Sequence, residues 1–89
     1  MPTGNGIFTI QLIQNSLYML QFPYSYNTYD SYAYILMQKG DYRNSIDYFR
    51  KGLIVLKKYP EKNDLESVKK DSDQALVYIK EKEEKISGK

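Results

Sequence analysis

The chain has 89 residues, a net charge of +2, and neither cysteine nor histidine. A chain of this length forms one small domain, and without cysteine it has no disulfide framework and no thiolate metal ligand. The small net charge, with basic and acidic residues interleaved, argues against nucleic acid as a partner. The commonest general base, thiol nucleophile and transition-metal ligands are also missing, so we expect no enzyme activity, no cofactor and no metal site.

The charged residues are distributed unevenly along the chain. Residues 1–29 contain no Asp, Glu, Lys or Arg, so all 13 basic and 11 acidic side chains lie from Asp30 onward. Two explanations are open: the uncharged segment belongs to the core, or part of it docks on another chain or on a larger parent protein. The same segment lacks the basic start of a signal peptide, and residues 7–22 are too few and too polar to span a bilayer. We therefore expect a cytoplasmic protein with no membrane span.

The first predicted helix covers residues 7–21, after an unstructured start over residues 1–6. Apolar residues recur along it at steps of three and four, which is typical of an amphipathic helix. Phe22 ends the helix because the residue before a proline, here Pro23, is pushed out of the helical region. The recurring apolar residues are Ile10, Ile13, Leu17 and Leu20, with Ile7 and Leu12 flanking them.

Two further helices are predicted over residues 26–39 and 42–59. Ser25 is the expected N-cap of the first of them, and Gly40 is the expected left-handed residue after its end. Asp41 then caps the next helix, and so short a link forces the two helices to lie antiparallel and side by side. Their buried stripes are predicted to be Tyr29, Tyr32, Ala33 and Leu36 in the first, and Ile46, Phe49, Leu53 and Leu56 in the second.

A fourth helix is predicted over residues 64–85, after Pro60 stops the third and a capping signature at residues 63–66 starts a new one. Its polar side is densely charged, as suits a terminal helix that faces water. We therefore predict an all-α fold of four helices, with one domain over residues 7–86 and a frayed tail over residues 87–89. The apolar line of the fourth helix is Leu65, Val68, Ser72, Ala75, Leu76, Ile79 and Ile86.

Residues 26–60 resemble one tetratricopeptide repeat when they are laid on the 34-residue pattern of that family. Pro60 comes three residues late, so the third helix is nearly one turn longer than the pattern. The resemblance implies a central antiparallel hairpin, flanked by a half-repeat and a charged terminal helix, that binds a protein or peptide without catalysis. The matching positions are Tyr29, Tyr32, Ala33, Leu36, Gly40, Tyr42, Ser45, Phe49, Gly52 and Pro60.

The stretch from Phe22 to Ala33 is also similar to segments in C-terminal repeat appendages of some bacterial serine hydrolases. In those appendages, a repeat helix that ends in Phe-Pro leads into a Tyr-Asp-Ser helix. This resemblance implies an alternative function, as a structural appendage of a hydrolase, or a truncated remnant of one, with no activity of its own.

A candidate peptide-binding face follows from the repeat register. The solvent-facing positions of the first repeat helix would line its concave side, and their amide, aromatic and thioether groups suit an extended peptide or a partner helix. The alternative, that these positions are ordinary surface, stays open. Tyr26 is likewise expected to be available for binding. The five candidate residues are Asn27, Asp30, Tyr34, Met37 and Gln38.

The first helix also carries the signal for self-association. It is apolar around more than one face, whereas a neighbouring hairpin covers a single stripe roughly 100° wide. We therefore predict a homo-oligomer in which this helix and the corner after it contribute to the contact. The candidate contact residues are Phe8, Leu12, Leu17, Tyr18, Phe22 and Tyr24.

Overall fold

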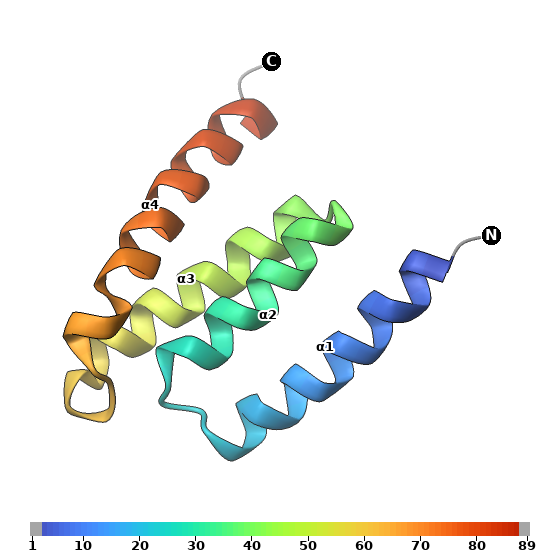
Figure 1. Ribbon diagram of the computed structural model, residues 1–89. Helices are drawn as coiled ribbons and strands as arrows, with labels where there is room; N and C mark the ends of the chain where they lie inside the picture. Colours follow the sequence, from blue (N-terminus) through green and yellow to red (C-terminus); the bar gives the residue numbers. More distant parts are fainter. Residues whose placement is uncertain (1–2, 88–89) are drawn as a thin grey trace.

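The computed structural model describes residues 3–87, and over these residues it contains helices and no strand. This confirms the predicted all-α fold of four helices. The α2–α3 hairpin lies in the middle, with α1 on one side and α4 on the other (Figure 1). The elements are α1 (Thr3–Gln21), α2 (Tyr26–Lys39), α3 (Tyr42–Lys58), the short 3-10 helix η1 (Pro60–Lys62) and α4 (Leu65–Ser87).

The turn between α2 and α3 is built as the sequence predicts. Gly40 has a φ of 93°, in the left-handed region that glycine adopts without a steric cost. Its N–H donates to the Met37 carbonyl at 3.0 Å, and the Asp41 N–H donates to the Leu36 carbonyl at 2.9 Å. The Asp41 carboxylate then accepts a hydrogen bond from the Asn44 N–H, which caps the start of α3. The last carbonyls of α2 and a free amide of α3 are satisfied within this turn.

Small residues allow α2 and α3 to approach closely. Ala33 and Ser45 are fully buried between the helices, and Gly52 is buried as well. A Cβ atom on Gly52 would lie 3.0 Å from the Cβ atom of Tyr29 and 3.2 Å from ring carbons of Tyr26. A Cβ atom here would fit only if these neighbours shifted by a few tenths of an ångström, so the contact is closest at this glycine.

The core joins α4 to this hairpin. Val68, Ala75 and Ile79 are the buried apolar residues of α4, whereas Leu65 and Leu76, which were predicted to share their stripe, are exposed. That part of the prediction is wrong because α4 contacts the hairpin along a narrow line, and residues at the edge of the stripe lie outside this contact. The buried cluster shared by α2, α3 and α4 consists of Ala33, Ile46, Phe49, Ala75 and Ile79.

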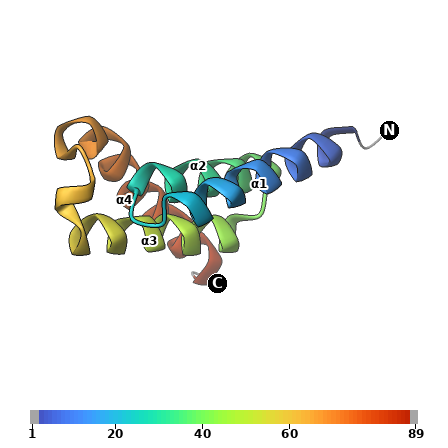
Figure 2. The same ribbon diagram turned by 90° about the horizontal axis from the view of Figure 1, so that it is seen from below.

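Helix α1 begins at Thr3, although residues 1–6 were predicted to be unstructured. Residues 3–6 extend the helix by its first turn, because each residue added to an existing helix gains a backbone hydrogen bond. Residues 1–2 and 88–89 lie outside the described part of the chain, so the predicted tail is described only at Ser87, where α4 ends. The N-terminal half of α1 projects past the α2–α3 hairpin (Figure 2).

The side of α1 that packs is not the one that carries the recurring apolar residues. Ile10, Ile13, Leu17 and Leu20 are all more than half exposed, and half-buried residues on the other side of the helix face α2. Periodicity shows that a helix has apolar stripes, but it does not show which stripe a single neighbour will cover. The residues half-buried on the packed side are Phe8, Gln11, Leu12, Asn15, Ser16 and Met19.

Two of the polar side chains on the packed side of α1 form hydrogen bonds within the helix. The Asn15 amide donates to the Gln11 carbonyl at 2.8 Å, and the Ser16 hydroxyl donates to the Ile13 carbonyl at 2.7 Å. Among the described residues, no buried side-chain nitrogen or oxygen atom lacks a hydrogen-bond partner, so this mixed face packs against α2 without the cost of an unpaired buried polar group. Within residues 3–87, no helix is long and apolar enough to cross a membrane.

Candidate functional site: the groove between α2 and α4

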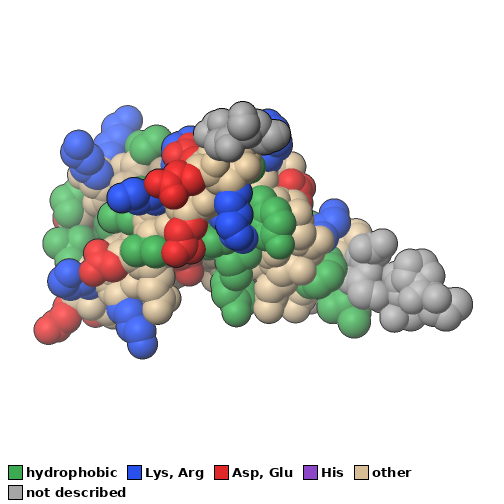
Figure 3. Space-filling model, turned by 90° about the horizontal axis from the view of Figure 1, so that it is seen from above, with side chains coloured by type: hydrophobic (Ala, Val, Ile, Leu, Met, Phe, Trp, Pro, Cys, Tyr) green, Lys and Arg blue, Asp and Glu red, His purple; other side chains and the backbone are tan. Residues whose placement is uncertain are grey.

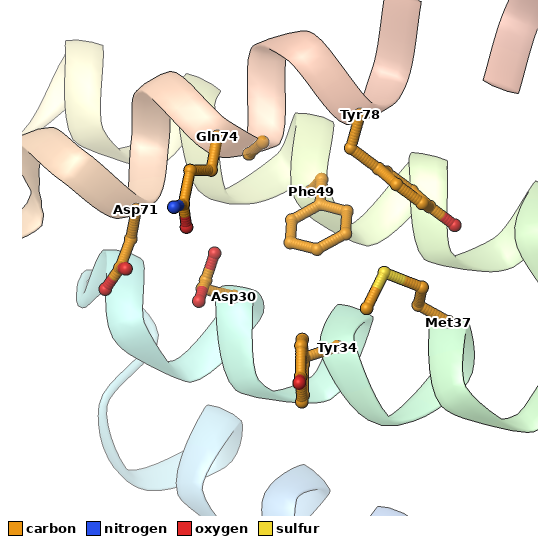
Figure 4. A pocket seen from close by; sticks show the side chains of 8 residues that line it. Asp30, Tyr34, Met37, Phe49, Asp71, Gln74 and Tyr78 are labelled. Atoms are coloured by element: carbon orange, nitrogen blue, oxygen red, sulfur yellow. The ribbon is translucent and has the colours of Figure 1, made fainter. Parts of the chain in front are cut away.

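A groove of about 290 Å³ opens between α2 and α4, above the side chain of Phe49 from α3. The contact between α2 and α4 is far less extensive than that between α2 and α3, so the two helices leave this space along their length. In Figure 4, Asp30 and Gln74 point toward each other across it, and Met37 points toward the ring of Tyr78. The lining residues are Asp30, Tyr34 and Met37 of α2, Phe49 of α3, and Asp71, Gln74, Ala75 and Tyr78 of α4.

The base of the groove is aromatic and held in place. The rings of Phe49 and Tyr78 meet edge to face with centroids 5.2 Å apart, a favoured aromatic geometry. The Tyr78 hydroxyl lies 2.6 Å from the Ser45 hydroxyl, which itself donates to the Tyr42 carbonyl at 2.8 Å. Phe49 is buried and Tyr78 is half-buried, so the base offers a fixed apolar surface beneath an open rim.

The end of the groove nearest the α2 N-terminus is acidic. The Asp30 carboxylate accepts a hydrogen bond from the Tyr26 hydroxyl at 2.8 Å. Burial, with the nearby charge of Asp71, raises the pKa of Asp30, although the Tyr26 hydrogen bond acts in the opposite direction. Burial and the Asp30 charge also raise the pKa of Tyr26, which keeps its proton and remains the donor. Among the described residues that line the groove, none is basic.

Asn63, in the loop before α4, forms hydrogen bonds with the start of α2. Its side-chain oxygen accepts a hydrogen bond from the Tyr26 N–H at 2.7 Å. Its amide nitrogen donates to the carbonyls of Tyr24 and Tyr59, each at 3.0 Å. Ser25, which was predicted to cap α2, makes no side-chain cap hydrogen bond. Asn63 supplies the missing acceptor from 37 residues away, and so ties the start of α2 to the loop before α4.

Three of the five predicted peptide-binding residues line the groove: Asp30, Tyr34 and Met37. Asn27 and Gln38 are exposed and do not belong to its lining. At about 100° per residue they lie farther around α2 than the three groove residues do. The expected availability of Tyr26 is wrong, because its ring is fully buried against the close α2–α3 contact.

The predicted self-association residues divide between two sides of α1 and its corner. Phe8 and Leu12 are half-buried on the side facing α2. Leu17, Tyr18 and Phe22 are exposed. Tyr24 is also exposed, and its ring lies 4.4 Å from that of Tyr59, centroid to centroid.

Sequence reasoning missed the groove residues of α4 and Asn63. Asp71 and Gln74 look like ordinary members of a charged helical face, and only the docking of α4 turns them toward α2. Within residues 3–87, no group of three or more carboxylates is placed to hold a metal ion. Comparison with models of protein families, with curated proteins and with solved structures finds no match to this chain.

Proposed function

We propose that this protein is a non-catalytic binding module that holds a segment of a partner protein or peptide in the groove between α2 and α4. The observation that carries the proposal is the groove itself, which has a fixed apolar base, an exposed aromatic rim at Tyr34 and an acidic end. Its volume is near the low end of the roughly 300–1,000 Å³ typical of ligand sites. The occupant therefore inserts one or two side chains and does not enter whole.

The lining selects the chemistry of those side chains. Phe49, Met37 and Tyr78 offer a surface for an apolar group, and the thioether of Met37 adapts to different shapes. Asp30 and Asp71 stand at one end without a basic neighbour in the lining. A Lys or Arg side chain fits both parts, because its aliphatic stem packs on apolar surface while its charge reaches the carboxylates. The preferred partner segment carries a basic residue next to a large apolar one.

The test is a selection from a display library of random peptides, followed by anisotropy titrations of the enriched peptides. Tyr34→Ala and Asp71→Asn should each raise the Kd at least about tenfold, because each removes a rim contact that a bound side chain uses. The matched controls are Leu76→Ala and Glu66→Gln, which remove an apolar group and a carboxylate from α4 outside the groove. Both controls should bind as the wild type does.

Two outcomes would contradict the proposal. One is a selection that enriches no peptide with a basic residue beside an apolar one. The other is a peptide whose affinity is unchanged in the Tyr34→Ala, Asp71→Asn double variant. Circular dichroism of each variant separates loss of binding from loss of the fold, and exposed Tyr34 is replaceable without opening the buried cluster.

A second candidate function is a structural role as an appendage of a serine hydrolase, which the resemblance at residues 22–33 implies. The observation that favours it is the exposed apolar side of α1, which suits contact with another folded body. A hydrolase reading frame directly upstream, and a stable complex with its product on co-expression, are the expected results. An isolated gene with its own promoter would argue against this role.

A further inference from the structure

The outer face of α1 is an unusually complete apolar surface. Five aliphatic side chains form it, and each is between 56% and 79% exposed. Leu12 and Met19 lie about half a turn around the helix, on the side that packs against α2. The outer face is therefore not the edge of an internal contact but a separate stripe. Its members are Ile7, Ile10, Ile13, Leu17 and Leu20.

The outer four positions of this stripe are spaced symmetrically along the helix. Its midpoint falls immediately after Ile13, and Ile10 and Leu17 stand equally far from that point on either side. Ile7 and Leu20 likewise stand equally far from it. When a second copy is turned by 180° about this midpoint, an aliphatic residue therefore meets an aliphatic residue at these four positions, which gives the self-complementary pairing of a two-fold contact.

We infer that two copies of this chain associate through the outer faces of α1, packed antiparallel about a two-fold axis near Ile13. Ile10 of one copy then packs against Leu17 of the other, and Ile7 of one copy lies opposite Leu20 of the other. The dimer contact uses a different surface from the α2–α4 groove, so a result for or against dimerisation does not decide whether the groove binds a peptide. Both grooves remain open in the dimer, because the groove and the outer face of α1 lie on opposite sides of α2.

Charge favours a second copy over a partner of different composition. The helix carries no Asp, Glu, Lys or Arg, so two copies meet without repulsion, and no charge on this face selects another partner. Acidic and basic side chains instead crowd together on the left and centre of the face that Figure 3 shows from above. Antiparallel packing also sets the two helix dipoles in opposite directions, which is the favourable arrangement.

A polar group near the midpoint fits the same arrangement. Gln14 is exposed next to Ile13, close to the proposed axis. A side-chain amide both donates and accepts hydrogen bonds, so the Gln14 amides of two antiparallel copies satisfy each other. A polar residue at one position of a helix contact is a known means of fixing register, and a slipped pairing would leave these amides without a partner.

The area available matches a reversible dimer. The five stripe residues, with exposed Tyr18 and Phe22 beside them, offer roughly 500–700 Å² of apolar surface per chain. Stable complexes bury about 800 Å² per partner, so this contact lies at the lower end of specific interfaces. We expect a Kd of roughly 1–100 µM, and hence a mass that changes with concentration.

The first test is light scattering across that concentration range, where the wild type should pass from its 10.5 kDa monomer mass to twice that value. Ile10→Lys and Leu17→Glu should each weaken the dimer at least about 30-fold, because each places one charge in an apolar contact. An equimolar mixture of the two variants should dimerise again. In the antiparallel arrangement the new ammonium faces the new carboxylate, and the second contact of the pair keeps its wild-type residues.

The second test uses the absence of cysteine from the chain. Ile13→Cys should form a disulfide-linked dimer rapidly on mild oxidation, because position 13 of the two copies meets near the axis. Val77→Cys, on an exposed part of α4, is the matched control and should stay uncrosslinked. Ile54→Lys, which adds a charge to an exposed residue of α3, should leave the dimer unchanged. Circular dichroism checks that every variant keeps its helices.

Three results would overturn the inference. The first is a wild-type mass that stays at the monomer value up to about 1 mM, well above the expected Kd. The second is a mixture of the Ile10→Lys and Leu17→Glu variants that does not dimerise. The third is a monomeric wild type that floats with phosphatidylcholine vesicles, which would assign the apolar face of α1 to a lipid surface.

Discussion

Helix α2 makes two contacts of opposite character, one with α3 and one with α4. Toward α3 it is closely packed, and a Cβ atom on Gly52 would lie only 3.0 Å from the Cβ atom of Tyr29. Toward α4 it is open, with a groove whose acidic end is formed by Asp30 and Asp71. Residue size and polarity account for the difference, because small residues let two backbones approach, whereas larger polar residues keep α4 at a distance. One helix thus serves as part of a rigid scaffold on one side and as part of a binding surface on the other.

The replacement of Gly52 by Val tests the tight side and should give the largest effect. The added side chain starts 3.0 Å from the Tyr29 Cβ atom and 3.2 Å from the Tyr26 ring, so the helices must separate. We expect a loss of about 2–3 kcal/mol in the free energy of unfolding, measured by urea titration. Gly6→Ala is the control, because nothing lies within 4 Å of its added Cβ atom. An unchanged stability in the Gly52→Val variant would mean that α2 and α3 do not approach as closely as described.

The α2–α3 contact was also the part most open to prediction from sequence. Gly40 and Asp41 form hydrogen bonds with the backbone of residues close to them in the sequence. The apolar stripe of α3 around Phe49 packs against α2, which is joined to α3 by a link of only two residues. Interactions between residues close in the sequence were therefore enough to predict that α2 and α3 form an antiparallel hairpin.

The groove and the orientation of α1 were harder to predict, for physical reasons that concern distant contacts. Asp30, Tyr34 and Met37 were identified from one helix, but their partners in α4 depend on a docking angle that no local pattern encodes. Asn63 acts on Tyr26 across 37 residues, so its role has no sequence signature. For α1, two stripes compete for one neighbour, and the difference between them rests on side-chain packing with α2 and not on periodicity.

The replacement of Asn63 by Ala tests the hydrogen bonds that connect the loop before α4 to the start of α2. The variant loses three hydrogen bonds, including the one that satisfies the Tyr26 N–H in the first turn of α2. We expect a loss of about 1–2 kcal/mol in the free energy of unfolding, and faster hydrogen exchange at the Tyr26 amide. Ser25→Ala is the matched control and should change little, since Ser25 makes no side-chain cap bond. The reverse order of effects would show that Ser25, and not Asn63, caps α2.

The replacement of Asp30 by Asn tests the acidic end of the groove and should give the smallest effect, visible mainly through its pH dependence. Burial raises the pKa of Asp30 in the folded protein above its ordinary value of 3.8, so the folded state binds this proton more readily than the unfolded state does. The contribution of this group to stability is therefore fully present below pH 3.8 and is lost as the pH rises through the folded pKa. The Asn variant keeps an oxygen that accepts from the Tyr26 hydroxyl but carries no titrating group. Relative to the wild type, the Asn variant should therefore become more stable as the pH rises from about 3.5 to about 7, the range in which carboxyl groups titrate, as measured by urea titrations. Glu66→Gln, on the exposed side of α4, should show no such change. A relative loss of stability by the Asp30→Asn variant over that interval would mean that the Asp30 charge is stabilised in the groove, and a cationic side chain would then gain little by entering it.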